Sequence, residues 1–418
     1  MNRLLSALLI VLLLGICTPE SIFAGRERVI EREFEMERGG NLELYIDTGG
    51  DMEIKGWDKS LVGVRISIRG RDRDDVEVEF DTGSRGLEID IEYSGRRRNR
   101  SSDLEVEIMV PERFDLSVET CGGDVLIAGV EGDIKGKTMG GDLEFERLKG
   151  DLRFTTMGGD VSVHDSELDG RVKTMGGRVV IEDVTGDLEG STMGGKVVYK
   201  NVTGRKDKSG DKEISITTFG GDIEAGHPGR KVKAKTFGGD IDISEGEEVN
   251  VTTMGGDINV DKAPSGAKVK TMGGDVSIHS AGGYVVAHTM GGDIEVDAVD
   301  GWVKATTMGG DVEVRMVGDP DRGRRDVEIT SMGGDIELVV PEDLSMEFDV
   351  EIAYTKSSRR NYKIVSDFDI DIERTSEWEG SWWRGEKKKY VYGTGSVRGG
   401  KHTIRIKTVN GSIYLKKD

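Results

Sequence analysis

The sequence predicts an all-β protein: a parallel β-helix, or β-solenoid, with coils of about 18 residues, two short strands per coil and a cap at each end. Three observations support this prediction. A Met-Gly-Gly tripeptide recurs at a nearly fixed spacing, the intervals alternate apolar and polar residues, and no later stretch has a good helical period. Since a fixed period of this size is typical of stacked repeats, the spacing predicts the architecture.

The tripeptide usually stands inside Thr-Met-Gly-Gly-Asp, and most copies are 18 residues apart. Single steps of 17, 24 and 26 residues depart from this spacing. We interpret residues 204–212 and 318–325 as inserted surface loops that account for the long steps. The first glycines of the pairs are Gly122, Gly140, Gly158, Gly176, Gly194, Gly220, Gly238, Gly255, Gly273, Gly291, Gly309 and Gly333.

One unit, residues 156–173, shows how the repeat predicts strands. Val161 and Val163 fall on one face of a first short strand, and Val172 and Thr174 fall on one face of a second. Gly158-Gly159 and Asp169-Gly170 are turn signals between them. Stacking such units would place Val, Ile, Leu and Thr in inward columns, with no room for an internal ligand cavity.

The chain begins like an exported protein. A positive start, an apolar run over residues 4–17 and Ala24 before Gly25 predict a signal peptide over residues 1–24. The alternative is a lipoprotein signal that uses Cys17. The apolar run is short for a membrane span, and we expect no transmembrane segment elsewhere. The predicted location is therefore outside the cytoplasm: periplasmic, cell-surface or extracellular.

The remaining chain divides into three segments. Residues 116–340 hold the regular repeat. Residues 25–115 contain an early corner at residues 48–51, and residues 341–418 end with a degenerate one at residues 408–415. Because the ends of a solenoid expose unpaired strand edges, we expect these two flanking segments to be caps.

The charge and cysteine content limit the function. A formal net charge of -21 argues against DNA, RNA or anionic lipid as the main partner. Once residues 1–24 are removed, Cys121 is the single cysteine, so no internal disulfide forms. Cys121 occupies a Met slot of the repeat, and we interpret it as a small residue at that position.

The repeat motif, Thr-x-Gly-Gly-Asp-Ile-x-Val, resembles the bacterial "putative adhesin" family of β-strand-repeat proteins, which is related to head domains of autotransporter adhesins. The resemblance covers about residues 40–418 and includes residues 110–124, 364–368 and 404–415. It implies a parallel β-helix and an exported or envelope-associated protein. It carries no catalytic residues to transfer.

The Asp after each glycine pair is a candidate metal ligand. Stacked carboxylates repel one another, and a divalent cation between coils would relieve that repulsion. The interpretation we favour is that each Asp bonds the backbone of its own turn. We expect no metal and no cofactor. The main members of this column are Asp142, Asp160, Asp257, Asp275, Asp293 and Asp311.

Two sets of side chains are candidates for partner binding. Trp378, Trp382 and Trp383 stand close together near cationic residues, and they either close the C-terminal end or form a binding loop. The Met slot of the repeat either forms an exposed apolar stripe, which we favour, or folds back into the core at the glycines. Among its members are Met254, Met272, Met290 and Met308.

These observations predict a non-catalytic structural or adhesive surface module. The possible partners are a protein, a polysaccharide or a second copy of the chain. An accessory or sensor domain that binds envelope polysaccharide or peptide is the alternative. A glycan-active β-helix enzyme is disfavoured because the coils are uniform and aromatic residues are few.

Overall fold

The computed structural model confirms the all-β class. It describes residues 21–24, 27–83, 86–95, 102–204, 213–358, 360–379 and 387–418. These residues form one continuous sheet of 33 strands, and their one helix is the short 3-10 helix η1 (Arg73–Asp75). Cys17, in the predicted signal peptide, lies outside the described residues.

The strands fall into an N-terminal group, a middle group and a C-terminal group. The N-terminal group comprises β1 (Ser21–Ala24), β2 (Glu27–Glu35), β3 (Gly40–Ile46), β4 (Asp51–Trp57), β5 (Leu61–Gly70), β6 (Val76–Thr82), β7 (Gly86–Tyr93) and β8 (Ser102–Pro111). The first part of the middle group comprises β9 (Phe114–Thr120), β10 (Val125–Ala128), β11 (Glu131–Thr138), β12 (Leu143–Glu146), β13 (Lys149–Thr156), β14 (Val161–Lys173), β15 (Val179–Thr185), β16 (Leu188–Ser191), β17 (Val197–Lys200) and β18 (Glu213–Thr217). The second part comprises β19 (Ile223–Lys235), β20 (Ile241–Thr252), β21 (Ile258–Ala263), β22 (Gly266–Lys270), β23 (Val276–His288), β24 (Ile294–Thr307), β25 (Val312–Met316), β26 (Val327–Ser331) and β27 (Ile336–Val340). The C-terminal group comprises β28 (Met346–Thr355), β29 (Ile364–Ser366), β30 (Asp371–Arg374), β31 (Lys388–Val397), β32 (His402–Val409) and β33 (Ile413–Lys417).

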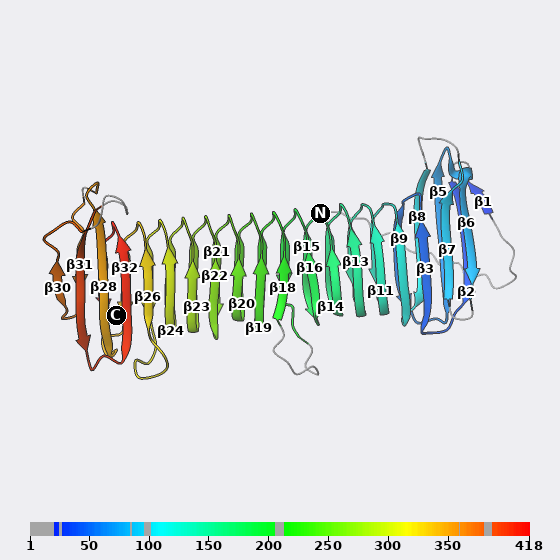
Figure 1. Ribbon diagram of the computed structural model, residues 1–418. Helices are drawn as coiled ribbons and strands as arrows, with labels where there is room; N and C mark the ends of the chain where they lie inside the picture. Colours follow the sequence, from blue (N-terminus) through cyan, green and yellow to red (C-terminus); the bar gives the residue numbers. More distant parts are fainter. Residues whose placement is uncertain are drawn as a thin grey trace.

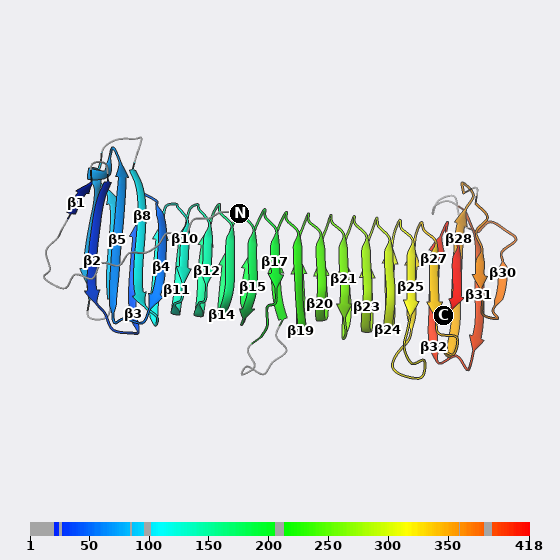
Figure 2. The same cartoon turned by 180° about the vertical axis from the view of Figure 1, so that it is seen from behind.

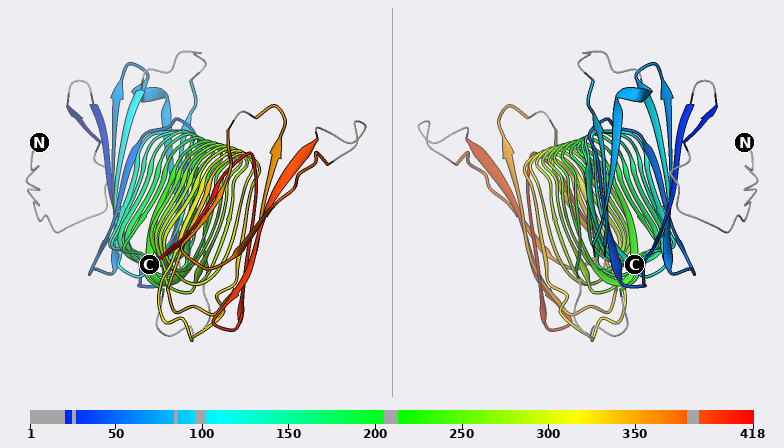
Figure 3. Two further views of the ribbon diagram at one scale, coloured as in Figure 1. Left: turned by 90° about the vertical axis from the view of Figure 1, so that its left-hand side faces the viewer. Right: turned by 90° about the vertical axis from the view of Figure 1, so that its right-hand side faces the viewer.

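In the middle group, each repeat pairs in parallel with the equivalent residues of its neighbours. Leu143 pairs with Val125 of the preceding repeat and with Val161 of the following one. Strands that lead into the Met-Gly-Gly corners form one row, and strands that leave them form a second row, visible from behind (Figures 1 and 2). The corners therefore line up along one long edge of the molecule, and the end-on views show a flat cross-section (Figure 3).

The expected two short strands per repeat are present in only part of the stack. In β14, β19, β20, β23 and β24 the chain continues through the second bend as one strand. Four non-glycine residues at bends between β12 and β18, one of them within β14 itself, lie in the left-handed backbone region, at a cost of about 1 kcal/mol each. These residues are Arg147, Asp165, Asp183 and Asn201, with φ between 50° and 56°.

The interior is filled by side chains from both rows. Alternate residues of each strand point inward, so Val, Ile and Leu of successive repeats lie above one another and are buried. At the corners, the inward-pointing residues are mostly buried threonines, as the alternation predicts. The loop at 318–325 projects from the opposite edge as expected, although Arg325 within it is buried.

Both ends of the stack depart from sequence order. Segment 40–57 lies between segments 86–111 and 114–128, because β3 pairs with β7 and β9 while β4 pairs with β8 and β10. Similarly, segment 402–417 lies between 327–340 and 346–366. The early and late copies of the corner motif are therefore inserted repeats, each held on both sides.

Beyond these inserted repeats, the strands become antiparallel. At the N-terminal end, β2, β5 and β8 pair antiparallel, as do β6 and β7. Phe34 and Phe80 meet between these two groups with ring centroids 5.5 Å apart. At the other end, β28 and β30 pair antiparallel with β31, and Phe348 contacts Phe368 at 5.4 Å.

Candidate functional site

The Met-Gly-Gly corner is built around a buried threonine. In one repeat, the Thr174 hydroxyl donates to the carbonyl of Gly159 in the preceding repeat, at 2.8 Å. The same oxygen accepts the N–H of Gly177 within its own corner, at 3.2 Å. A hydroxyl therefore satisfies two backbone groups that the ladder leaves unpaired at the bend. The pattern recurs at Thr192, Thr218, Thr236, Thr253, Thr271, Thr289 and Thr307.

The two glycines of a corner have different roles. A Cβ atom at the second glycine, Gly159, would overlap the carbonyl oxygen of Gly141 in the repeat before it. A Cβ atom at the first glycine, Gly158, would have the Cα of Gly140 as its nearest neighbour, at 3.8 Å. Close approach of successive repeats therefore requires glycine at the second position.

The aspartates after the glycines form a ladder between repeats. The Asp142 carboxylate accepts the backbone N–H of Asp160, and the Asp257 carboxylate accepts that of Asp275, both at 2.8 Å. The expectation that each Asp bonds its own turn is wrong for this bond, because Oδ1 reaches the next repeat. The same bond joins the pairs Asp51–Asp124, Asp124–Asp142, Asp222–Asp240, Asp240–Asp257, Asp275–Asp293, Asp293–Asp311, Asp311–Asp335 and Asp335–Ser412.

Arg178 takes the Asp position in one corner, so a positive charge follows Asp160 in this ladder. Its backbone N–H and its guanidinium both donate to Asp160, at 2.7 and 2.9 Å. Burial raises the pKa of Asp160, but these hydrogen bonds and the positive charge outweigh burial and hold that pKa below its usual value. Among the described residues, no group of three or more His, Cys, Asp or Glu side chains is placed to hold a metal ion.

The methionines of the corners form an exposed row, which we call the Met row. Its side chains are 38–63% exposed, so the glycines do not turn them into the core. Met254, Met272, Met290 and Met308 all belong to it, at 40–45% exposure. The complete row consists of Met139, Met157, Met175, Met193, Phe219, Phe237, Met254, Met272, Met290, Met308 and Met332, and the exposed Cys121 precedes it in the equivalent slot.

Of the predicted tryptophan cluster, Trp378 is described, whereas Trp382 and Trp383 lie outside the described residues. Trp378 is half-buried and meets Tyr354 edge-to-face at 5.9 Å. The Lys389 ammonium lies 5.2 Å from its ring centroid. Beside it, the rings of Tyr390 and Tyr392 stack at 5.7 Å. The C-terminal end therefore carries an aromatic group with an adjacent cation.

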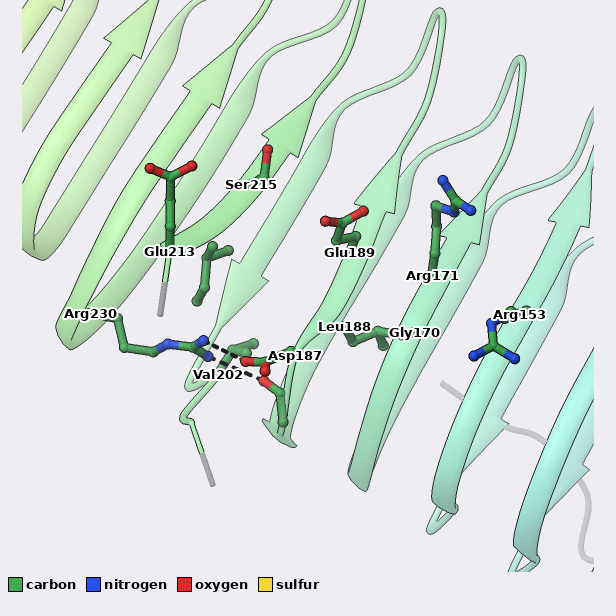
Figure 4. A pocket seen from close by; sticks show the side chains of 12 residues that line it. Arg153, Gly170, Arg171, Asp187, Leu188, Glu189, Val202, Glu213, Ser215 and Arg230 are labelled. Atoms are coloured by element: carbon green, nitrogen blue, oxygen red, sulfur yellow. Dashed lines mark hydrogen bonds and ion pairs between the residues drawn. The ribbon is translucent and has the colours of Figure 1, made fainter. Parts of the chain in front are cut away.

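Sequence reasoning missed a hollow of about 320 Å³ between β16 and β18 (Figure 4). Only Ser191 and Thr217 pair between these strands, so the row opens between them. Of the insertion predicted over residues 204–212, residues 205–212 lie outside the described residues. Arg230 closes one side, bonding Asp187 at 2.6 Å and the carbonyl of Gly186 at 3.2 Å. No sequence signal marks the hollow beyond the long step between corners.

Tyr199 fills the opening from inside. Its buried phenol oxygen accepts the N–H of Gly190 and donates to the carbonyl of Leu188, at 3.1 Å for the second bond. These are backbone groups that regular pairing with β18 would otherwise engage. Burial raises the pKa of this phenol well above its usual value, so it stays protonated.

Comparisons with known proteins agree with the predicted resemblance. Residues 229–416 match the family described as Toastrack DUF4097. Solved structures of putative adhesins are similar to the chain: one from Parabacteroides distasonis (14% identity, TM-score 0.36, 64% of this chain and 96% of that chain) and one from Parabacteroides merdae (13%, 0.30, 65% and 96%). A third, from Bacteroides fragilis, is 17% identical, with a TM-score of 0.26 and coverage of 64% and 96%.

No curated protein is significantly similar to the chain. Within the described ranges, no helix is long and apolar enough to span a membrane. The sequence resemblance to a β-repeat family is thus confirmed by an independent match that covers the second half of the stack. Residues 229–416 are therefore the part of the chain that is similar to the Toastrack DUF4097 family.

Proposed function

We propose that this chain is an exported, non-catalytic surface module: a parallel β-solenoid that presents the Met row to a partner. The observation that carries the proposal is the row itself, in which eleven large apolar side chains stand exposed along one edge. Continuous apolar surface of this length is unusual on a soluble protein and marks interaction sites. Equivalent residues of successive repeats pair in parallel, and this pairing supports the proposed solenoid.

We further propose four segments: a signal peptide over residues 1–24, end segments over 25–115 and 341–418, and the regular solenoid over 116–340. Removal of residues 1–24 would also remove β1, which pairs antiparallel with β2. The resemblance to adhesins and the export signal together support an envelope or extracellular location. Cell fractionation, with the folded protein followed by antibody, tests the location, and recovery in the cytoplasm alone would contradict it.

The shape of the molecule favours a narrow partner over a second copy lying along the whole row. Strands β5 and β8 rise above the line of corners at one end (Figures 1 and 3). A flat partner as long as the stack would meet these strands before it reached the row. A slender chain, or a convex surface shorter than the row, would reach it.

Partner contact is tested by replacing the same methionines with a charged residue and with an apolar one. Labelled protein is added to envelope preparations, and its saturable retention is measured. Substituting Met254, Met272, Met290 and Met308 with Asp should abolish retention, whereas substituting the same four with Leu should preserve it. Equal retention of the Asp and parent proteins would exclude the row as the contact surface. A panel of polysaccharides incubated with the protein, with no cleavage expected, tests the non-catalytic assignment.

The second candidate is recognition of envelope polysaccharide or peptide by the C-terminal aromatic group. Trp378 with Lys389 offers a ring and a cation side by side, a combination that suits a polar ligand with an apolar face. Trp378→Ala should then reduce the retention of the protein on envelope preparations, whereas the Met-to-Asp variant should be retained as well as the parent. The opposite result would favour the Met row.

A further inference from the structure

The Met row is rich in sulfur as well as apolar. Nine of the 15 methionines in the sequence stand in this row, whereas the inward columns use mainly Val, Ile and Leu. An apolar contact alone would be met equally well by Leu, which has no sulfur. We propose that the row binds a soft monovalent cation, Cu(I), through the thioether sulfurs of methionines from neighbouring repeats.

The arrangement supplies the required number of sulfurs. Two uninterrupted runs occur, one from Met139 to Met193 and one from Met254 to Met332. Between them Phe219 and Phe237 stack with centroids 4.6 Å apart. Within each run the flanking strands pair in register, so neighbouring methionines start about 4.8 Å apart.

The side chains can converge from that spacing. Methionine has three rotatable side-chain bonds and a polarisable sulfur, so neighbouring thioethers can turn toward one ion. In the second run the side chains of Met272, Met290 and Met308 are 41%, 40% and 45% exposed, which leaves them accessible to an ion from solvent. No part of the interior has to open.

Electrostatics and ligand type favour the same class of ion. The Asp ladder lies beside the Met row, and each of its carboxylates has one oxygen beyond that used by the next repeat. Its negative field, like the net charge of -21, raises the local concentration of cations. Thioethers are neutral, soft ligands that select Cu(I) over the hard cations that carboxylates prefer.

The test uses the full-length chain with both Cys17→Ser and Cys121→Ser, since a thiol binds the same ions. Ag(I), which has the charge and softness of Cu(I), is titrated calorimetrically in chloride-free buffer. Cu(I) is titrated without oxygen against a chromogenic chelator. We expect saturable binding by this parent. Replacing Met272, Met290 and Met308 with Leu should remove the sites of the second run and so lower the number of Ag(I) ions bound, while the first run, from Met139 to Met193, still binds.

The matched control is Met316→Leu, which changes a fully buried methionine and should leave Ag(I) affinity unchanged. Circular dichroism and melting temperature show that each variant is folded. Parent protein that fails to bind Ag(I), or a triple Leu variant that binds as many Ag(I) ions as the parent with the same affinity, would overturn the proposal. The two proposals can fail independently. Partner contact is lost when the methionines become Asp but kept when they become Leu, whereas metal binding is lost when they become Leu.

Discussion

At the scale of single residues, the corner shows how one motif solves three problems of stacking. The threonine hydroxyl makes hydrogen bonds to a backbone carbonyl and a backbone N–H at the bend. The second glycine permits close approach of successive repeats. The aspartate caps an N–H of the next repeat. Each contact joins adjacent repeats, so the motif stabilises the stack only where it is repeated.

The glycine pair provides a direct comparison. Gly159→Ala should lower the free energy of unfolding by about 3 kcal/mol, because its Cβ would overlap the Gly141 carbonyl and force adjacent repeats apart. Gly158→Ala, one residue earlier, meets no atom closer than 3.8 Å and should be nearly neutral. Urea unfolding of both variants checks this. Equal destabilisation by the two would mean that close stacking does not explain the second glycine.

Tyr199 provides a test of the opening between β16 and β18. Tyr199→Phe leaves the Gly190 N–H and the Leu188 carbonyl without the phenol, and should cost about 1–3 kcal/mol. Tyr284→Phe is the control, because that phenol donates to Glu248 from a half-exposed position and its loss should cost less. Thermal unfolding measures both. A Tyr199→Phe variant as stable as the parent would show that water replaces the phenol.

At the scale of strands, the inserted repeats explain how the stack ends. Segment 402–417 is paired on both sides, so β28 and the strands beyond it attach to the stack through β32 and β33. The last residues of the chain therefore hold an end that precedes them in sequence. Folding of this end therefore requires segment 402–417, which follows β28 to β31 in sequence but lies between them and the stack.

Gly411 lies at the corner of this inserted repeat. Its Cβ in Gly411→Ala would overlap the Gly334 carbonyl, so the repeat should loosen by about 3 kcal/mol. We expect amide exchange in β28 and β31 to accelerate by roughly a hundredfold, while β10–β15 keep their protection. Hydrogen exchange followed by mass spectrometry resolves these segments. Unchanged protection of β28 would show that β31 and the end contacts suffice to hold it.

His402, at the start of β32, makes the same end sensitive to pH. Burial, and then the nearby Lys401 charge, lower the pKa of this imidazole despite the opposing charge of Asp326. Its Nδ1 accepts the backbone N–H of Arg325 at 3.4 Å. In the folded state, therefore, the ring binds a proton less readily than in the unfolded state.

The sign of the effect follows from this difference in proton affinity. Where the unfolded chain binds more protons, stability rises with pH, so the His402 contribution is complete above about pH 6.5 and is lost as pH falls below it. Melting temperature between pH 7.5 and 5 should fall more for the parent than for His402→Leu. Parallel pH profiles for the two proteins would exclude His402 as the source.

At the scale of the whole molecule, repetition converts one exposed residue into a surface as long as the stack. The Met row and the Asp ladder run side by side because most corners present a Met and an Asp at the same two positions. Neither feature depends on a unique pocket. If the Met row is the contact surface, as proposed, a single substitution in the row should have a small effect.

Mild peroxide oxidation should distinguish the Met row from the core. The row methionines, at 40–63% exposure, should be oxidised in the folded protein, whereas Met316 and Met346, which are fully buried, should resist. Peptide mass spectrometry quantifies each site, and the buried pair is the internal control. Protection of the row in isolated monomers would contradict its exposure, and protection only at high concentration would indicate self-association.

The sequence alone determined the repeat, the all-β class and the inward Thr column, and it favoured the outward direction of Met, which the structure confirms. These follow from period-two alternation and an 18-residue spacing, which are local properties of the chain. The resemblance to a β-repeat family depended on the same corner residues. Trp382, Trp383 and Cys17 lie outside the described residues, so the predictions made for them stay predictions.

Only the tertiary structure decided which repeats are neighbours and what the carboxylates contact. Asp142 bonds the amide of Asp160 because stacking places that residue of the next repeat beside it, a neighbour that no local pattern encodes. The insertion of segments 40–57 and 402–417 between other segments, and the reach of Tyr199 across the interior, depend on pairing between residues far apart in sequence. Local alternation sets the direction of each side chain, whereas long-range strand pairing selects its partner.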